Sequence, residues 1–266
     1  MVDIQHKQAK SILNKASGFI DSYDYTLNPY SGCTFGCSYC YAAFFTPTDE
    51  LQETWGQWVQ VKENALELLR KKRKRPLIDQ TLYMSSVTDP YQPVERKLEL
   101  VRSLLRELLD YHRVRLVVQT RSPLVTRDID LLREFKFVRV HMTVTTDDET
   151  VRKAFEPTCP SNQQRLDAIT EVAAAGIPTA ITMTPLLPVR DPESFAKSLL
   201  ATGARKFVVQ EFHLTRTRYA AGTGAHATKL AQQMGWNAAQ YQHVKHTLRA
   251  ALPNLYEGKA GFVPEW

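Results

Sequence analysis

The stretch that decides the fold is NPYSGCTFGCSYCY, residues 28–41. It holds three of the four cysteines, Cys33, Cys37 and Cys40, in the spacing Cys-x3-Cys-x2-Cys. A loop of this length can wrap three thiolates around one small inorganic centre, and its two glycines supply the backbone freedom that the wrap requires. Three thiolates on a [4Fe–4S] cube leave one iron without a protein ligand, where a small chelating cofactor can bind. The spacing therefore predicts a [4Fe–4S] cluster on these cysteines.

Two other interpretations of the cysteines are open. The first is a structural zinc site, which takes four ligands that usually come in two separated pairs. The fourth cysteine, Cys159, lies more than a hundred residues downstream of the loop. The second is a set of ordinary thiols with no ligand role. The tight spacing favours the cluster over both.

With Tyr39 directly before the third cysteine, the loop resembles that of the radical S-adenosylmethionine (SAM) family. In that family the open iron binds the amino and carboxylate groups of SAM. One electron splits SAM into methionine and a 5′-deoxyadenosyl radical, which removes a hydrogen atom from the substrate. The resemblance implies two cofactors, a [4Fe–4S] cluster and SAM, and a one-electron donor such as flavodoxin or ferredoxin.

Composition limits the class of protein. The chain has 266 residues, 43% of them hydrophobic, which is enough for a full core. It has no run of 18 apolar residues, so we expect no membrane span. The N-terminus has no apolar signal core, so secretion is not expected. Three clustered cysteines do not suggest a disulfide framework. Thiolate ligands need a reducing compartment, so we expect a cytoplasmic protein.

The net charge of +6 is compatible with a nucleic acid partner. Much of the excess positive charge lies in one run, RKKRKR, at residues 70–75. Such a run is also typical of a solvated helix end, where cations suit the helix dipole. We favour the helix end as the interpretation of this run.

The hydrophobic pattern predicts alternating strands and helices. Strands are expected at residues 25–27, 82–84, 114–118, 138–144, 177–183 and 207–209, and helices at 61–69, 96–109, 128–135, 162–175, 192–200 and within 226–251. Asp128 is the expected N-cap of the third helix, and residues 1–24 read as an irregular lead-in. Repeated strand–helix units imply a parallel sheet with right-handed crossovers.

Six such units fit either a doubly wound sheet or an incomplete barrel. The family resemblance implies the second, an α/β fold with a partial (β/α)6 TIM-like barrel and the cysteine loop after its first strand. We expect a single domain, with a lead-in at residues 1–24, a barrel core at 25–211 and a C-terminal helical closure and tail at 212–266. Active groups of such barrels gather where strands end.

Polar residues follow several of these strand ends. The second strand is followed by SSVTDPYQP, residues 85–93, which is either a site for the amino group and ribose of SAM or an ordinary polar turn. The third is followed by Arg121, which can pair with the methionyl carboxylate. His141, Glu211 and His213 lie at or near strand ends, where they either contact substrate or are satisfied core or rim residues. The pair His243 and His246 is expected at the surface.

A narrower resemblance is to the spore photoproduct lyase-like group, whose members are often labelled DNA repair photolyases. The residues that carry it are 37–41 (CSYCY), 87–89 (VTD), 120–122 (TRS), 155–157 (FEP) with Arg165, 175–178 (AGIP) and the tail 256–262 (YEGKAGF). Carried over by position, the SAM contacts that it implies are Tyr39, Thr88, Asp89, Arg121 and Thr143. Arg121 stands where the lyase has a lysine and keeps the charge.

The resemblance also implies catalytic candidates and one departure. Tyr41 corresponds to a lyase tyrosine that helps to relay a hydrogen atom, although packing against the barrel is the other interpretation. Val87 stands where the lyase has the cysteine that returns hydrogen to the product radical. Cys159 is either a replacement donor or a small buried hydrophobe. A nucleic acid substrate is implied, with a peptide, a small molecule or a non-catalytic iron–sulfur or nucleic-acid-binding protein as alternatives.

Overall fold

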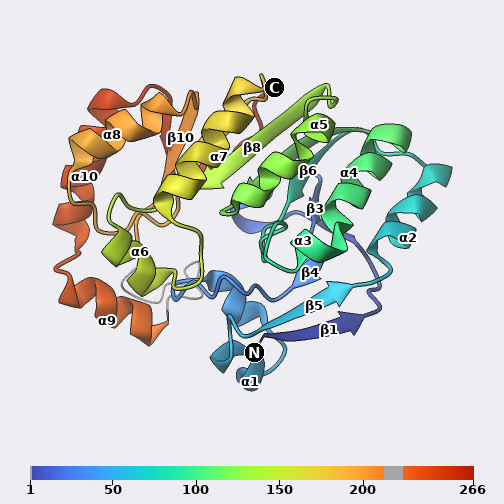
Figure 1. Ribbon diagram of the computed structural model, residues 1–266, viewed down its shortest axis with the longest axis horizontal. Coiled ribbons are helices and arrows are strands. Elements are labelled where there is room, and N and C mark those ends of the chain that lie inside the picture. The colour runs from blue at the N-terminus through green and yellow to red at the C-terminus, as the bar shows by residue number, and fades with distance from the viewer. Residues whose placement is uncertain (1, 213–223) are drawn as a thin grey trace.

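The computed structural model describes residues 2–212 and 224–266, and its centre is an eight-stranded sheet (Figure 1). In sheet order the strands are β11 (Leu255–Glu257), β10 (Lys206–Val209), β9 (Thr179–Met183), β8 (Phe137–Thr143), β7 (Arg113–Thr120), β6 (Ile78–Met84), β3 (Tyr25–Leu27) and β2 (Leu13–Lys15). From β3 to β10, all neighbours pair in parallel and in chain order. The six predicted strands and the α/β partial barrel are therefore confirmed.

Helices pack against the outer face of this sheet and beyond the carboxyl ends of its strands (Figure 1). They are α2 (Ala65–Arg70), α3 (Glu95–Leu98), α4 (Leu100–Tyr111), α5 (Ile129–Leu132), α6 (Glu149–Phe155), α7 (Asn162–Ala174), α8 (Pro192–Ala201), α9 (Ala225–Gln233) and α10 (Ala238–Ala251). Figure 1 shows α4, α5, α7 and α8 lying across the strands. None of the helices in the described ranges is long and apolar enough to cross a membrane.

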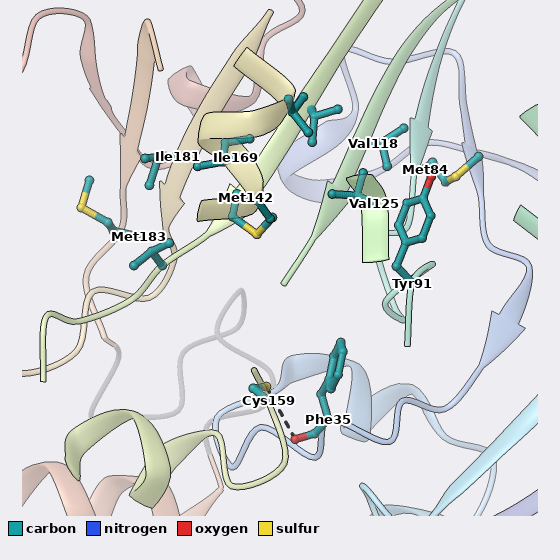
Figure 2. Packing of buried hydrophobic residues seen from close by; sticks show 14 of the residues in the cluster. Phe35, Met84, Tyr91, Val118, Val125, Met142, Cys159, Ile169, Ile181 and Met183 are labelled. Atoms are coloured by element: carbon teal, nitrogen blue, oxygen red, sulfur yellow. Dashed lines mark hydrogen bonds between the residues drawn. The ribbon is translucent and has the colours of Figure 1, made fainter. Parts of the chain in front are cut away.

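The main core lies between the sheet and these helices. The central strands are largely buried, and polar residues such as His141 of β8 and Thr182 of β9 lie among their apolar ones. Figure 2 shows Met142 of β8 and Ile181 of β9 close to Ile169 of α7, and Val118 of β7 close to Val125. This packing fixes the strand ends, where the candidate site lies.

A second cluster fills the concave side of the sheet. Tyr23 and Tyr83 pack edge to face, and Phe262 from the C-terminal tail packs against Tyr83. The tail reaches this position because β11 adds to the edge of the sheet beside β10. A Cβ atom at Gly261 would overlap the side chain of Val208, so the tail backbone packs directly against the strand with no room for a side chain at this position.

The N-terminal segment differs from the prediction. Residues 1–24 were expected to be irregular, but β1 (Asp3–Lys7) pairs in parallel with β5 (Trp58–Lys62), and β2 pairs antiparallel with β3. With β4 (Tyr30–Ser31), β1 and β5 form a small second sheet. All five residues of β1 are exposed, so no apolar alternation marks the strand in the sequence. The helix predicted from residue 61 starts only at Ala65, because Val61 belongs to β5.

Of two further predicted helices, the one at 96–109 is divided and the one at 128–135 is shortened to α5. The helix expected at residues 96–109 is divided into α3 and α4 by Glu99, whose φ is +48°. Asp128 occupies the predicted N-cap position, before the short helix α5, but its side chain makes no cap hydrogen bond. The carboxylate is instead buried and ion-paired with Arg102 and Arg127. Helix α6, which the sequence pattern did not predict, precedes a loop that becomes important at the site.

Candidate cofactor and active site

A cavity of about 550 Å³ opens at the carboxyl ends of the parallel strands. Its walls include Ser85 to Asp89 after β6, Thr120 and Arg121 after β7, Thr184 and Pro185 after β9, and Gln210 and Glu211 after β10. This edge is where barrels of parallel strands carry their active groups. The volume lies within the range of ordinary small-molecule sites.

The cysteine loop forms one wall, with Cys33, Cys37 and Cys40 all lining the cavity. Two short turns shape the loop, since the Gly36 amide donates to the Cys33 carbonyl at 3.2 Å and the Cys40 amide to the Cys37 carbonyl at 3.0 Å. Gly36 has φ +56°, and a Cβ atom at Gly32 (φ +75°) would overlap Trp58. The glycines therefore have the positive φ that the wrap was expected to need.

The loop that follows β6 fastens the cysteine loop in place. The Thr88 hydroxyl donates to the Gly32 carbonyl at 2.6 Å. The buried Gln92 accepts from the Thr34 amide at 3.1 Å and donates to Thr88 at 3.1 Å. The two loops are thus held together by backbone and side-chain hydrogen bonds that do not involve the thiols.

The three thiols sit in different electrostatic surroundings. Burial raises the pKa of the Cys33 thiol well above its ordinary value and raises that of Cys40 to about 11. The pKa of Cys37 is lowered, first by a hydrogen bond from Cys159, whose sulfur lies 3.6 Å away, and also by Arg121. Among the described residues, no three histidine, cysteine or carboxylate side chains are arranged around a single metal ion. A cube bound through three separate irons does not require such convergence.

Asp89 connects the ends of β6 and β7. It is buried and accepts from the Thr120 hydroxyl at 2.7 Å and from the backbone amides of Tyr91 and Arg121 at 2.9 and 2.8 Å. Burial raises its pKa, and these three hydrogen bonds oppose the rise. The carboxylate thus fixes the backbone from which the Arg121 side chain projects.

Arg121 and Tyr39 meet at the cavity wall. An Arg121 Nη2 hydrogen donates to the Tyr39 hydroxyl at 3.2 Å, while Nε has no hydrogen-bond partner among the described residues. The Tyr39 hydroxyl in turn donates to the buried carboxylate of Glu156. Burial alone would lower the pKa of Arg121, but Tyr39, Cys37 and Glu156 raise it, so the guanidinium stays charged. Its side chain keeps 20% of its surface exposed, which leaves donor capacity for an anion.

The structure brings most of the predicted site residues together. Tyr39, Tyr41, Thr88, Asp89 and Arg121 line the cavity with the three cysteines. The Tyr41 hydroxyl donates to the Ser86 carbonyl, and the ring is 48% exposed.

Thr143 and Cys159 do not line the cavity. Thr143 is fully buried and bonds to Gln119 and Thr182 at 3.1 and 2.9 Å, so Gln119 stands at the cavity in its place. Cys159 is 7% exposed and lies behind Cys37, with its sulfur 3.8 Å from the Phe35 carbonyl oxygen (Figure 2). That placement does not favour a hydrogen-donor role for Cys159.

The predicted substrate contacts Glu211 and His141 differ in whether they line the cavity. Glu211 lines the cavity, whereas His141 is buried outside it, with no hydrogen-bond partner for either ring nitrogen among the described residues. His213 lies outside the described residues. His243 and His246 are exposed on α10, as expected.

Sequence reasoning missed two buried residues beside the site. Gln92 was quoted only as part of a polar turn, and Glu156 only as part of a family motif. The motif pairs Glu156 with Arg165, but its contacts with Tyr39 and Arg121 come from segments far away in the sequence.

The basic run lies at the other end of the strands. Lys71 to Lys74 form a turn after α2 that precedes β6, whereas the cavity follows the end of the same strand. Seven strand residues separate the two by about 20 Å. Within the run, Arg73 pairs with Glu107 and packs over the ring of Tyr111.

A partial parallel barrel with a cysteine loop at the carboxyl end of its first strand defines the class of protein. The chain belongs to the radical SAM superfamily, whose family profile matches residues 27–200. It is a radical SAM enzyme, as the resemblance implied.

Relatives were also found by sequence. An uncharacterized protein of Methanocaldococcus jannaschii is 35% identical over 187 residues, 70% of this chain and 69% of the relative. An uncharacterized protein of Mycobacterium tuberculosis is 30% identical over 220 residues, 77% of this chain and 64% of the relative.

Solved structures share the fold at low identity. Spore photoproduct lyase complexed with dinucleoside spore photoproduct matches with a TM-score of 0.65 at 15% identity, covering 96% of this chain and 81% of the lyase. Streptococcus suis SuiB bound to S-adenosylmethionine matches with a TM-score of 0.52 at 12% identity, covering 87% and 49%. The resemblance to the lyase therefore extends to the fold.

Proposed function

We propose that this enzyme holds a [4Fe–4S] cluster on Cys33, Cys37 and Cys40 and binds SAM beside it for reductive cleavage. The observation that carries the proposal is that the three thiols and Arg121 line one cavity. The donor set fits both groups, because soft thiolates suit iron–sulfur clusters and a partly exposed guanidinium at the cavity wall suits a carboxylate.

When bound and reduced by one electron, these cofactors supply a 5′-deoxyadenosyl radical that removes hydrogen from a substrate. The chain supplies orientation and protection. Arg121 would hold the methionyl carboxylate of SAM, and Tyr39 would hold its adenine. The loop at Thr88 and Asp89 would hold the amino group and ribose. Thr143 supports this wall through Gln119 rather than by direct contact.

Return of hydrogen to the product needs a donor, and Val87 cannot act as one. Tyr41 and Val87 both line the cavity, and the Tyr41 hydroxyl is anchored to the Ser86 carbonyl next to Val87. We assign the relay to Tyr41. Replacement by phenylalanine is expected to leave SAM cleavage intact and to reduce turnover of the true substrate.

For the substrate, we propose a nucleic acid. Three exposed aromatic rings line the cavity, Phe19, Tyr41 and Phe45, at 37%, 48% and 63% exposure, and exposed aromatic rings are the platforms on which bases stack. Lys15 lies on the same lining. The lyase structure with a dinucleoside photoproduct supports this choice. A peptide is the second candidate, because SuiB bound to its precursor peptide SuiA shares the fold with a TM-score of 0.54.

The chemistry also implies an electron donor and a cellular compartment. The electron is delivered by a one-electron donor such as flavodoxin or ferredoxin. The enzyme works in the cytoplasm, where thiolate ligands stay reduced.

The test is anaerobic reconstitution followed by an assay for 5′-deoxyadenosine with SAM and dithionite. Formation in the intact protein and not in the Cys40→Ala variant supports the proposal. A fully loaded cluster with no 5′-deoxyadenosine would contradict it and favour a non-catalytic iron–sulfur protein. Affinity for single-stranded DNA or RNA that falls as salt rises supports the nucleic acid substrate, and affinity indifferent to salt argues against it.

A further inference from the structure

Glu156 is the most heavily engaged buried carboxylate beside the cavity. It follows α6 and is fully buried. Its Oε2 accepts from Arg165 at 2.5 Å, and its Oε1 accepts from the Thr145 hydroxyl at 2.9 Å and from the Tyr39 hydroxyl. The same Oε1 lies 3.8 Å from Arg121 Nε. One carboxylate therefore touches the cysteine loop, the end of β8 and the arginine from the end of β7.

The loop that carries Glu156 is docked firmly against the cysteine loop. The Ser38 amide donates to the Phe155 carbonyl at 2.8 Å, and the Thr158 hydroxyl donates to the Thr34 carbonyl at 2.7 Å. Arg152 donates to the carbonyl of Glu156 itself at 2.9 Å. These hydrogen bonds fix the backbone at Glu156 and so limit the movement of its carboxylate relative to Arg121.

Two cations share one carboxylate at this wall. Arg165 is completely buried and pairs with Glu156, and Arg121 is a second cation on the same anion. Arg165 makes the shorter contact, at 2.5 Å against 3.8 Å for Arg121. Glu156 is therefore neutralised mainly by Arg165, and the Arg121 guanidinium remains available at the cavity.

We infer that Glu156 is a positioning residue for SAM: paired with Arg165, it holds Arg121 through the Tyr39 hydroxyl so that the guanidinium faces the methionyl carboxylate while keeping its charge. This inference rests on the proposed function. The two arginines then have different roles. Arg165 neutralises Glu156, and Arg121 is left to bind the carboxylate of SAM.

The experiment measures the dissociation constant of SAM on reconstituted protein with matched iron content. Glu156→Gln removes the charge and keeps one of the two acceptor oxygens. We expect it to raise the dissociation constant about tenfold or more, the size of one charge-assisted hydrogen bond. Glu149→Gln is the matched control, because Glu149 lies at the start of α6, the helix that precedes Glu156, and pairs with Arg152 rather than with Arg121. We expect a change of less than about twofold there.

A double-mutant cycle distinguishes positioning from general weakening of the structure. If Glu156 acts through Arg121, Glu156→Gln weakens SAM binding about tenfold in the wild-type background and less than about twofold in an Arg121→Met background. An equal loss in both backgrounds, or no loss in either, overturns the inference.

Three further outcomes are informative. If Glu156→Gln does not fold, Tyr39→Phe takes its place in the cycle, since it removes only the bridging hydroxyl and leaves the Glu156–Arg165 pair intact. If the wild-type protein carries a full cluster and binds no SAM, the proposed function fails and the inference fails with it. If the wild-type protein binds SAM and the cycle shows no coupling, only the inference fails.

Discussion

At the scale of single residues, the sulfur of Cys159 lies 3.6 Å from that of Cys37 and outside the cavity lining. A hydrogen bond to a ligand thiolate favours the reduced cluster, which carries more negative charge. We expect Cys159→Ala to lower the midpoint potential of the cluster by about 20–60 mV, the one-electron equivalent of about 0.5–1.4 kcal/mol. A redox titration followed by electron paramagnetic resonance (EPR) measures it.

Cys159→Ser is the control for this prediction, because it keeps a donor and is expected to shift the potential less. An unchanged potential combined with lost turnover of the substrate would restore the hydrogen-donor role for Cys159.

Arg165 and Glu156 form a buried pair, and removing one partner leaves an uncompensated charge. We expect Arg165→Met to lower the free energy of unfolding of the apo-protein by about 3–5 kcal/mol. Arg106→Met is the comparison, since Arg106 makes an exposed pair with Glu134 at 3.8 Å and should contribute less than about 1 kcal/mol. Urea unfolding measures both, and similar losses would contradict this account.

At the scale of elements, the C-terminal tail closes the concave side of the barrel. Gly261→Ala places a Cβ atom into Val208, which is fully buried. We expect a loss of about 1–3 kcal/mol in the free energy of unfolding. Val208→Ala in the same chain should recover part of it, because it removes the atoms that a Cβ would meet.

Gly224→Ala is the control for the tail, because the nearest atom to its Cβ would be the Ser38 carbonyl oxygen at 3.7 Å and its φ is negative. If the tail does not pack as described, the two alanine variants would be equally stable.

How well each element was predicted depends on its burial. The strands from β3 to β10 could be predicted because each contains a short buried apolar segment that alternates with a helical pattern. The exposed β1 could not, because only its pairing with β5 makes it a strand. The break at Glu99 has no Gly or Pro to announce it.

The site was also predicted only in part. The cysteines and Arg121 could be found because each belongs to a local motif at a strand end. Gln92, Gln119 and Glu156 could not, because their contacts are made between segments far apart in the sequence.

At the scale of the whole molecule, the cavity and the basic run occupy opposite ends of the strands. Replacing Lys71, Lys72 and Lys74 with glutamine is therefore expected to leave the rate of 5′-deoxyadenosine formation within about twofold and the affinity for a short oligonucleotide largely unchanged. The comparison is Lys15→Gln at the cavity, which should weaken oligonucleotide binding. The reverse pattern would place the nucleic acid on the basic run.

The central claim is that the cavity holds the cluster and SAM side by side, with one iron open to SAM. The most direct measurement is the EPR spectrum of the reduced, reconstituted protein, recorded with and without SAM. The account predicts a [4Fe–4S]⁺ signal that changes on addition of SAM, because SAM becomes a ligand of the open iron. A full-strength signal that SAM leaves unchanged would contradict it.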